Sequence, residues 1–254
     1  MVNLIGINGK IGAGKDTIAS IIQYLMGEHD EEGSFKDFNE FIKANPIPTL
    51  NSPKMWGSGW EIKKFAGKLK EVCSLLTGIP VTDFEKQEVK DSYLGEEWNI
   101  TFQHDSDGFL TRKMKVRELL QKVGTECLRD NLHQNVHVNA LFADYKHTQS
   151  AQAGFLNPGK GPFEPIGKGT FGGYPKWIIS DLRFPNELQA IKDRNGISIR
   201  VTRPGTVVGS HPSEIALDNA EFDYEIENSD TIEELIVKVK IILTQIGAYE
   251  LLGK

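Results

Sequence analysis

Apolar residues follow two different spacings along this chain. Short apolar runs over 2–8, 176–181 and 197–202 are typical of strands that are buried on both faces of a sheet. Residues 16–26 and 231–246 instead carry apolar side chains three and four positions apart, which predicts amphipathic helices. Because strands that alternate with helices favour a parallel sheet with helices on both faces, we predict an α/β fold whose sheet has about five strands.

Weaker patterns complete this prediction. We predict further strands over 59–65 and 222–227, and further helices over 66–77, 114–131, 135–147 and 185–194. Pro185 at the start of the last of these supports it, since proline suits the first position of a helix. Residues 81–113 are mixed and charged, and their pattern predicts no regular element.

Two polar segments interrupt the alternation of strands and helices. Residues 27–58 are punctuated by Gly, Pro, Asn and Ser, and we interpret them as an inserted loop with one short helix near 36–43. Residues 148–175 hold seven glycines and four prolines, which argues against regular structure there. We expect the 254 residues to form a single domain of the P-loop kinase type with these two insertions.

Composition narrows the possible partners and the cellular compartment. The net charge of −6 argues against non-specific binding to nucleic acid, although a local basic pocket for a small anion is compatible with it. No apolar run approaches the ~20 residues that cross a bilayer, and the N-terminus lacks the features of a signal peptide. Cys73 and Cys127 fit a reducing compartment. We therefore expect a cytoplasmic protein that contacts neither nucleic acid nor membrane.

A glycine-rich motif follows the first predicted strand and precedes a helix. It matches the G-x-x-x-x-G-K pattern in the structural context which that pattern requires. Its glycines allow a sharp turn that points backbone N–H groups inward, and the helix N-terminus also favours phosphate oxygens. Lys15 adds a point charge that can follow a transferred phosphoryl group. The predicted phosphate site comprises Gly9, Lys10, Ile11, Gly12, Ala13, Gly14, Lys15, Asp16 and Thr17. The alternative, a merely flexible turn, is disfavoured because strand, loop and helix agree.

The position after Lys15 departs from the usual motif. A serine or threonine hydroxyl there normally contacts Mg²⁺, but this chain has Asp16, followed by Thr17. Asp16 could hold a metal through water or cap the helix, and Thr17 could contact phosphate or the metal shell. His211 and Glu214 are spaced for a metal pair, but no third ligand is near in sequence, so we favour a role at a helix start.

Polar residues also follow other predicted strands. Asp181 ends an apolar strand, and Arg183 comes two residues later. Ligands gather at the carboxyl ends of strands in an open parallel sheet, where Asp181 could serve a metal or orient an acceptor and Arg183 could balance phosphate charge. The alternative is a helix-capping aspartate beside a surface arginine. Arg203 should face the same rim, and Asn228 could meet a base or cap the final helix.

Two predicted helices carry polar candidates for an acceptor site. Lys68 and Lys70 could face an acceptor phosphate, or could lie on a solvated helix face. Arg117, Gln121 and Thr125 are spaced i, i+4 and i+8, and therefore share one face of a regular helix. Their guanidinium, amide and hydroxyl groups would suit a phosphate and a base edge, although a polar stripe more often faces solvent.

Taken together, these motifs resemble the bacteriophage deoxynucleoside monophosphate kinases, a branch of the nucleoside monophosphate kinase group of P-loop proteins. The similar segments are GKIGAGKDT (9–17), FAGKLKEV (65–72), VRELLQKVGTECLRDNL (116–132), WIISDLRFPNE (177–187), IRVTRPG (199–205) and HPSEIALDNAEFDYEIENSDTIEEL (211–235). They occur in the same order and span most of the chain. The combination of LLQKVGTE with SDLRFPNE is more specific than GKDT, which other kinases share.

The resemblance implies transfer of the γ-phosphoryl group of ATP to a deoxynucleoside 5′-monophosphate, with Mg²⁺ as cofactor and a homodimer as a possible assembly. The catalytic residues it favours are Lys15, Arg117, Arg129, Asp181 and Arg183. The residues it favours for the acceptor are Lys68, Lys70, Arg117, Gln121, Thr125, Arg183 and Glu187. ATP would bind residues 9–17 and Asn228, and the metal would lie near Asp16 and Thr17, partly through water.

Three features differ from a compact kinase of this group. Residues 27–58 and 148–175 are additional, the second segment contains no arginine where the group has an arginine-rich lid, and His137 stands where we expect tryptophan. The sequence leaves three alternatives open. The protein could be a kinase of another acceptor, such as dephospho-coenzyme A or a mevalonate phosphate, a nucleotide-binding module with slow hydrolysis, or a structural phage protein with a relic phosphate loop. Base specificity is not fixed by the sequence.

Overall fold

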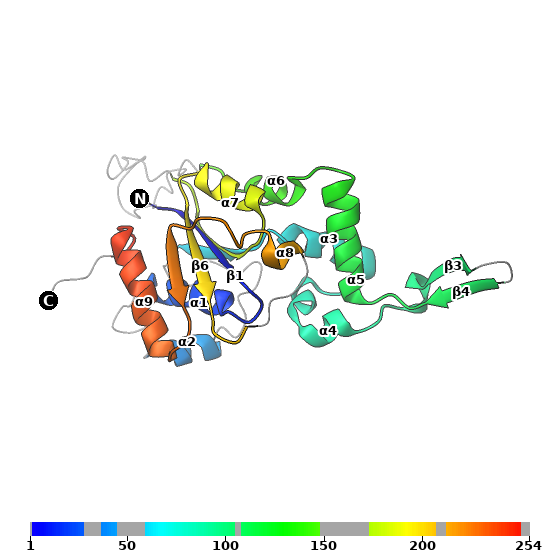
Figure 1. Cartoon of the computed structure of the whole chain (residues 1–254), viewed down its shortest axis with the longest axis horizontal. Coiled ribbons are helices and arrows are strands. Elements are labelled where there is room, and N and C mark those ends of the chain that lie inside the picture. Colours follow the sequence, from blue (N-terminus) through cyan, green and yellow to red (C-terminus); the bar gives the residue numbers. More distant parts are fainter. Residues whose placement is uncertain are drawn as a thin grey trace, which may run out of the picture.

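A five-stranded parallel sheet forms the centre of the protein, in a computed structural model that describes residues 2–27, 37–44, 59–104, 108–147, 173–206 and 212–249. Its strands are β1 (Leu4–Gly9), β2 (Trp60–Lys63), β5 (Lys176–Leu182), β6 (Ile197–Thr202) and β7 (Tyr224–Glu227). The order across the sheet is β2-β5-β1-β6-β7, and every neighbouring pair is parallel (Figure 1). The α/β fold with about five strands is therefore confirmed.

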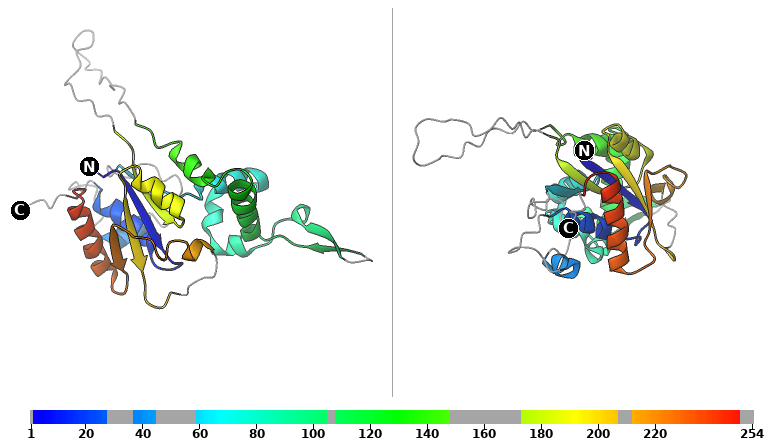
Figure 2. Two further views of the ribbon diagram at one scale, coloured as in Figure 1. Left: turned by 45° about the horizontal axis from the view of Figure 1, so that its top comes forward. Right: turned by 90° about the vertical axis from the view of Figure 1, so that its left-hand side faces the viewer.

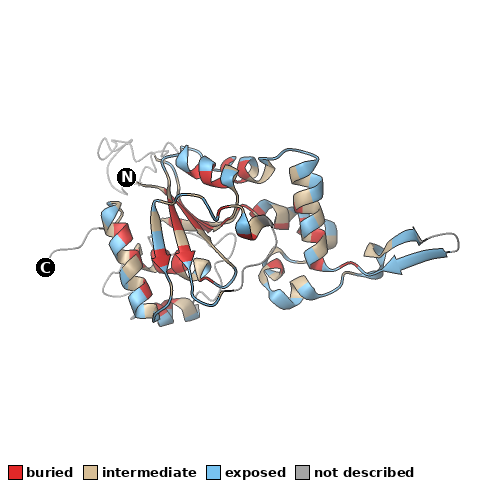
Figure 3. Cartoon of the chain, in the orientation of Figure 1, coloured by how far each residue is buried: buried red, intermediate tan, exposed pale blue. Residues whose placement is uncertain are grey.

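Helices cover both faces of this sheet. On one face lie α1 (Lys15–Leu25), α2 (Phe38–Ala44) and α9 (Ile232–Gln245), and on the other lie α6 (Val136–Phe142) and α7 (Pro185–Lys192). Successive residues of β5 point to opposite faces, so Ile178 packs in the first layer while Trp177 and Ile179 pack in the second. Figure 3 shows the buried strands between these layers. The continuous apolar runs in the sequence are explained by this burial on both faces.

A second region extends from one end of the sheet. It consists of α3 (Gly67–Thr77), η1 (Val81–Glu85), α4 (Gln87–Asp91), η2 (Glu96–Trp98), β3 (Ile100–His104), β4 (Gly108–Arg112), α5 (Val116–Gln121), the π-helix η4 (Lys122–Asp130) and, nearer the sheet, α8 (Pro212–Ile215). A small apolar cluster around Phe84, Cys73 and Leu119 holds α3, η1 and α5 together. Strands β3 and β4 form an antiparallel hairpin that projects away from the sheet (Figure 2). The sequence pattern of 81–113 did not predict this hairpin.

The helix predicted over 114–131 is not uniform. It begins as α5 and continues as a π-helix over Lys122–Asp130, in which each N–H bonds five rather than four residues back. Gly124 allows Leu69 of α3 to approach closely, since a Cβ added at Gly124 would lie 2.6 Å from the Leu69 Cδ2. The Gly124 carbonyl oxygen also lies 2.9 Å from a ring nitrogen of His137. The shared face predicted for Arg117, Gln121 and Thr125 assumes regular spacing, which holds for Arg117 and Gln121 in α5, whereas Thr125 lies in the π-helix.

Other predicted boundaries differ less. The helix predicted over 135–147 ends at Phe142, and the short helix predicted near 36–43 is α2. Residues 28–36, 45–58 and 148–172 of the two inserted segments lie outside the described residues. In the part of the chain that the structure describes, no helix is both long and apolar enough to cross a membrane.

Candidate functional site

The phosphate loop lies at the carboxyl end of β1 and leads directly into α1. Gly12 (φ 79°) and Gly14 (φ 101°) adopt the left-handed conformation that glycine tolerates best, and Gly14 caps α1. The Lys15 ammonium donates to the carbonyl oxygens of Gly9 at 2.6 Å and Lys10 at 2.8 Å. Burial, followed by the nearby Arg183 charge, lowers the pKa of Lys15. The loop therefore concentrates positive charge and backbone amides at the helix N-terminus, as phosphate binding requires.

Asn228 fixes the backbone of this loop. Its side-chain amide donates to the Ala13 carbonyl oxygen at 2.9 Å, and a Cβ at Gly14 would lie 2.5 Å from the same nitrogen. Helix α9 is instead capped by Thr231, whose hydroxyl accepts the Glu234 N–H at 3.3 Å. The prediction that Asn228 could cap the final helix is therefore wrong, because Asn228 contacts the loop itself.

Asp16 lies on the first turn of α1, with Thr17 half-buried beside it. One Asp16 oxygen accepts a hydrogen bond from the Ser180 hydroxyl at 2.7 Å and lies 3.5 Å from the Lys64 ammonium. The helix has no side-chain cap, so capping by Asp16 is wrong. Across the described ranges, no cluster of three His, Cys, Asp or Glu residues could hold a metal on its own. The Asp16 carboxylate with the Thr17 hydroxyl fits Mg²⁺, which typically takes one or two carboxylates and completes its shell with substrate phosphates and water.

Asp181 joins the end of β5 to the start of α3. Its two carboxylate oxygens accept the backbone N–H groups of Phe65 at 2.8 Å and Ala66 at 3.0 Å. It therefore caps the loop before α3, and not the helix that follows its own strand. Both hydrogen bonds hold the connection that carries Lys64. The Asp181 charge also acts on Lys15.

Arg183 connects the site to the short helix α8. Its guanidinium donates to Glu214 at 2.8 Å, and the second oxygen of Glu214 accepts the Ile11 N–H of the phosphate loop at 3.2 Å. Lys10 bonds the Glu214 carbonyl oxygen and Asp218. Glu214 therefore binds the loop and Arg183, while His211 lies outside the described residues. The sequence did not predict this contact, because no local pattern relates 214 to 11.

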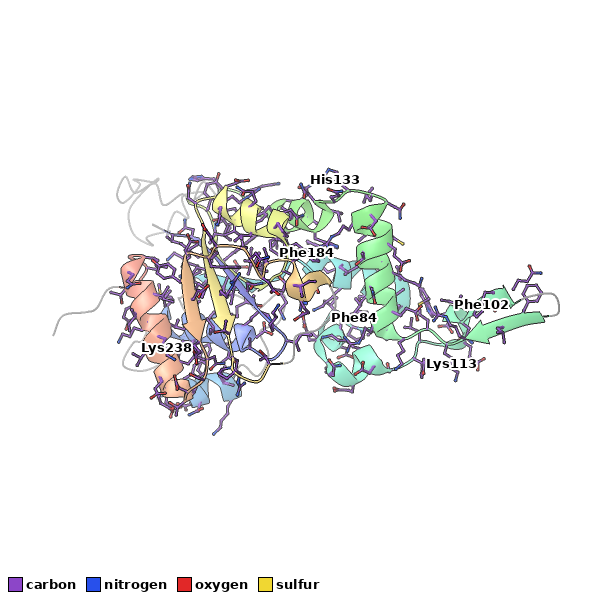
Figure 4. The ribbon with its side chains drawn as sticks, viewed as in Figure 1. Phe84, Phe102, Lys113, His133, Phe184 and Lys238 are labelled. Atoms are coloured by element: carbon purple, nitrogen blue, oxygen red, sulfur yellow. The ribbon has the colours of Figure 1, made fainter. Side chains whose placement is uncertain are left out.

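Arg129 and Glu187 meet at the start of α7. The Arg129 guanidinium carbon lies 3.7 Å from the centre of the Phe184 ring, and one Arg129 nitrogen lies 3.8 Å from Glu187. Glu187 accepts the N–H groups of Arg183 at 2.8 Å and of Phe184 at 3.0 Å. Phe184 is labelled in Figure 4. Burial, and next the Asp181 charge, raises the pKa of Glu187 to about 8. Glu187 thus orders the turn that carries Arg183 and lies beside Arg129.

The residues predicted for the acceptor site do not all lie together in the structure. Lys70 is buried, and its ammonium lies 2.6 Å from Glu85. Lys68 is exposed, and its ammonium lies 3.2 Å from Glu71. This agrees with the alternative that Lys68 lies on a solvated helix face. Arg117 is exposed and pairs with Asp91 at 3.0 Å. Gln121 is exposed and Thr125 is half-buried, while Arg203 is exposed at the end of β6.

Three residues of this neighbourhood were missed by the sequence analysis. They are Lys64, Glu85 and Ser180. Lys64 follows directly on β2, so the carboxyl-end rule that singled out Asp181 could have found it. Ser180 could not be separated from the apolar run that contains it, and Glu85 comes from a segment without a clear pattern.

Comparison with known proteins supports the family resemblance. No family model matches the chain. It is 26% identical over 250 residues to a protein of Acanthamoeba polyphaga mimivirus named "Putative deoxynucleotide monophosphate kinase", covering 93% of each chain. It is 22% identical over 256 residues to the "Deoxynucleotide monophosphate kinase" of Enterobacteria phage T4, covering 94% of this chain and 98% of that one. It is also 22% identical over 263 residues to the "Deoxynucleoside-5'-monophosphate kinase" of Escherichia phage T5, with 93% and 94% covered. The protein is therefore a relative of the viral deoxynucleoside monophosphate kinases, as its motifs predict.

Proposed function

We propose that the protein is a kinase that transfers the γ-phosphoryl group of ATP to a deoxynucleoside 5′-monophosphate, giving ADP and a deoxynucleoside diphosphate for DNA precursor synthesis. One observation carries this proposal. The phosphate loop with Lys15 lies beside Asp16, Asp181 and Arg183 at one sheet edge, in a chain that matches kinases of this name along nearly its whole length.

The supporting geometry suits direct in-line transfer without a covalent enzyme intermediate. The loop amides and Lys15 would hold the donor phosphates, while Arg183 and Arg129 would neutralise charge on the moving group. Asp16 and Thr17 would hold Mg²⁺, in part through water, and the ion would supply charge neutralisation at the donor phosphates. Arg117 would reach the acceptor only after exchanging its exposed partner Asp91. Positioning and electrostatics are most of the catalysis in this chemistry.

A panel of acceptors tests the proposal directly. The purified protein is incubated with ATP, Mg²⁺ and each of several deoxy- and ribonucleoside monophosphates, dephospho-coenzyme A and a mevalonate phosphate, and ADP release is measured. We expect a deoxynucleoside monophosphate to stimulate ADP release most. Stimulation by another acceptor alone would favour a different kinase, and slow ATP turnover that no acceptor stimulates would favour a nucleotide-binding module.

A calorimetric titration with ATP distinguishes the proposed kinase from the remaining alternative, a structural protein with a relic phosphate loop. A structural protein with a relic loop predicts no ATP binding, whereas the proposed kinase binds ATP in a way that depends on Lys15. The preferred base is read from the deoxynucleoside monophosphates of the same panel, because these differ from one another only in their bases.

A further inference from the structure

A second group of lysines lies next to the phosphate loop. Lys64 follows the carboxyl end of β2, and its side chain is only 10% exposed. Its ammonium lies 3.5 Å from Asp16, on the loop side, and 3.4 Å from Glu85, on the opposite side. The second oxygen of Glu85 accepts a hydrogen bond from the Lys70 ammonium at 2.6 Å. Lys64 therefore bridges the donor site and the region of α3 and η1.

This group contains more positive than negative charge. The Lys90 ammonium donates at 3.2 Å to the Glu85 carbonyl oxygen, a neutral acceptor, and burial followed by the Lys70 charge lowers the pKa of Lys90. Five cations thus face four carboxylates when Arg183 and Glu214, whose charges act on Lys15, and Asp181, whose oxygens already accept two backbone N–H groups, are all counted. The cations are Lys15, Lys64, Lys70, Lys90 and Arg183, and the carboxylates are Asp16, Glu85, Asp181 and Glu214.

An excess of cations in a half-buried site favours an anion. Uncompensated charge away from water is costly, and a phosphate monoester, with a charge of about −1.5 to −2 at pH 7, would balance it. Lysine suits such an exchange, because its ammonium is a point charge on a flexible stem that can leave one oxygen for another.

The direction of the group indicates which phosphate it would bind. Lys15 and the loop amides belong to the donor phosphates, and the acceptor must approach in line beyond the γ-phosphoryl group. From Asp16 the cations continue away from the loop through Lys64 to Lys70 and Lys90, which come from α3 and α4. The Arg117 charge acts on Lys90 and extends the row further.

We propose that Lys64 binds the 5′-phosphate of the acceptor, exchanging its contacts with Asp16 and Glu85 for the phosphate oxygens, with Lys70 beside it. This inference rests on the proposed function and names a residue of the acceptor site that neither the motifs nor the relatives assign. Glu85 is a positioning residue in this arrangement, since it holds Lys64 and Lys70 in place until the acceptor arrives.

The test compares Lys64→Met, Lys64→Arg and the control Lys86→Met. Lys86 is a more exposed lysine next to Glu85, and it pairs with Asp83 at 2.8 Å. Steady-state kinetics give separate KM values for the acceptor and for ATP. For Lys64→Met we expect the acceptor KM to rise about 10- to 100-fold, the range for a lost hydrogen bond to a charged group, while the ATP KM changes less than about threefold. Lys64→Arg should recover part of the loss, and Lys86→Met should behave as wild type.

Calorimetry adds a readout that does not depend on turnover. The wild type should bind the deoxynucleoside monophosphate more tightly than the deoxynucleoside without its phosphate, and Lys64→Met should shrink that difference about 10-fold or more. If Lys64→Met unfolds, Glu85→Gln replaces it. The glutamine amide oxygen can still hold the two lysines in place, while the loss of the competing negative charge should lower the acceptor KM several-fold. A merely structural Glu85 predicts lower stability with an unchanged acceptor KM.

The outcomes separate this inference from the proposed function. A wild type that phosphorylates no deoxynucleoside monophosphate would overturn both. An active wild type whose acceptor KM is unchanged by Lys64→Met, or a variant that raises only the ATP KM, would overturn the role of Lys64 and leave the kinase assignment intact.

Discussion

The sheet with its flanking helices and the region over residues 81–130 are held together differently. In the sheet, β1 and β5 are buried on both faces between two helical layers, and residues such as Ile5 and Ile178 are fully buried. In the 81–130 region, one small cluster around Phe84 supports the short helices, and every residue of β4 is exposed (Figure 3).

This difference has a consequence for the candidate site. Lys15, Asp181 and Arg183 are fixed by backbone hydrogen bonds and by the parallel sheet edge, so their positions follow from the fold. Arg117 belongs to the second region and is held only by an exposed pair with Asp91. Residues of the first kind are set in place before a substrate arrives, whereas under the proposed function Arg117 would have to be repositioned by it.

The largest effect should come from Lys15, at the edge of the sheet. Among the described residues, the Lys15 ammonium is the only side-chain cation of the phosphate loop that bonds the loop's own carbonyl oxygens. Lys15→Ala removes it, and we expect kcat to fall roughly 10²- to 10³-fold or more. Far-ultraviolet circular dichroism should show an intact fold. The matched control is Lys122→Ala in the second region, an outward lysine paired with Glu126 at 3.4 Å, whose turnover should stay near wild type. Equal turnover of both variants would contradict the assignment.

The sequence predicted the first region much better than the second. Continuous apolar runs identify β1, β5 and β6, because burial on both faces leaves no polar alternation to confuse them. The glycine motif is local, so its loop and helix follow from neighbouring residues. The π-helix could not be predicted from periodicity. The contacts of its Gly124, with Leu69 and with the His137 ring, come from other elements and have no local signature.

The candidate site was predictable where it depends on strand ends, and not where it depends on long-range pairs. Asp181 and Arg183 were found by the carboxyl-end rule. Glu214 approaches Ile11 from 203 residues away in sequence, and Asp16 meets Ser180 from 164 residues away. Such pairs have no local signature, because only the folded sheet edge brings their elements together.

The next largest effect should be on the free energy of unfolding, for a substitution in the buried centre of the sheet. Ile178→Ala creates a cavity in the centre of the sheet, and we expect the free energy of unfolding to fall by about 2–5 kcal/mol in urea titrations. Ile178→Val should cost only about 0.5–1.5 kcal/mol, since it removes one methyl group. A loss below about 1 kcal/mol for Ile178→Ala would contradict the tight packing of this layer.

A pH-dependent effect should come from Glu187, at the sheet edge. Because burial raises its pKa in the folded protein to about 8, well above the usual value near 4.5, the folded state retains a proton that the unfolded state has lost between these values. The contribution of Glu187 to stability is therefore present below about pH 4.5 and is lost as pH rises through about 8. In Glu187→Gln this dependence should vanish, so the wild type should lose stability relative to the variant between pH 5 and pH 8. Parallel curves of unfolding free energy against pH would show that Glu187 does not titrate in this range.

The smallest effect should come from the hairpin. Phe109 is 75% exposed on β4, opposite Gln103, and its removal uncovers no packed core. For Phe109→Ser we expect the free energy of unfolding to stay within about 0.5 kcal/mol of wild type in the same urea titrations. Turnover should also be unchanged, because the hairpin projects away from the phosphate loop (Figure 2). A loss above about 1.5 kcal/mol would mean that Phe109 is covered in solution, and the contrast between a buried sheet and an uncovered hairpin would then be wrong.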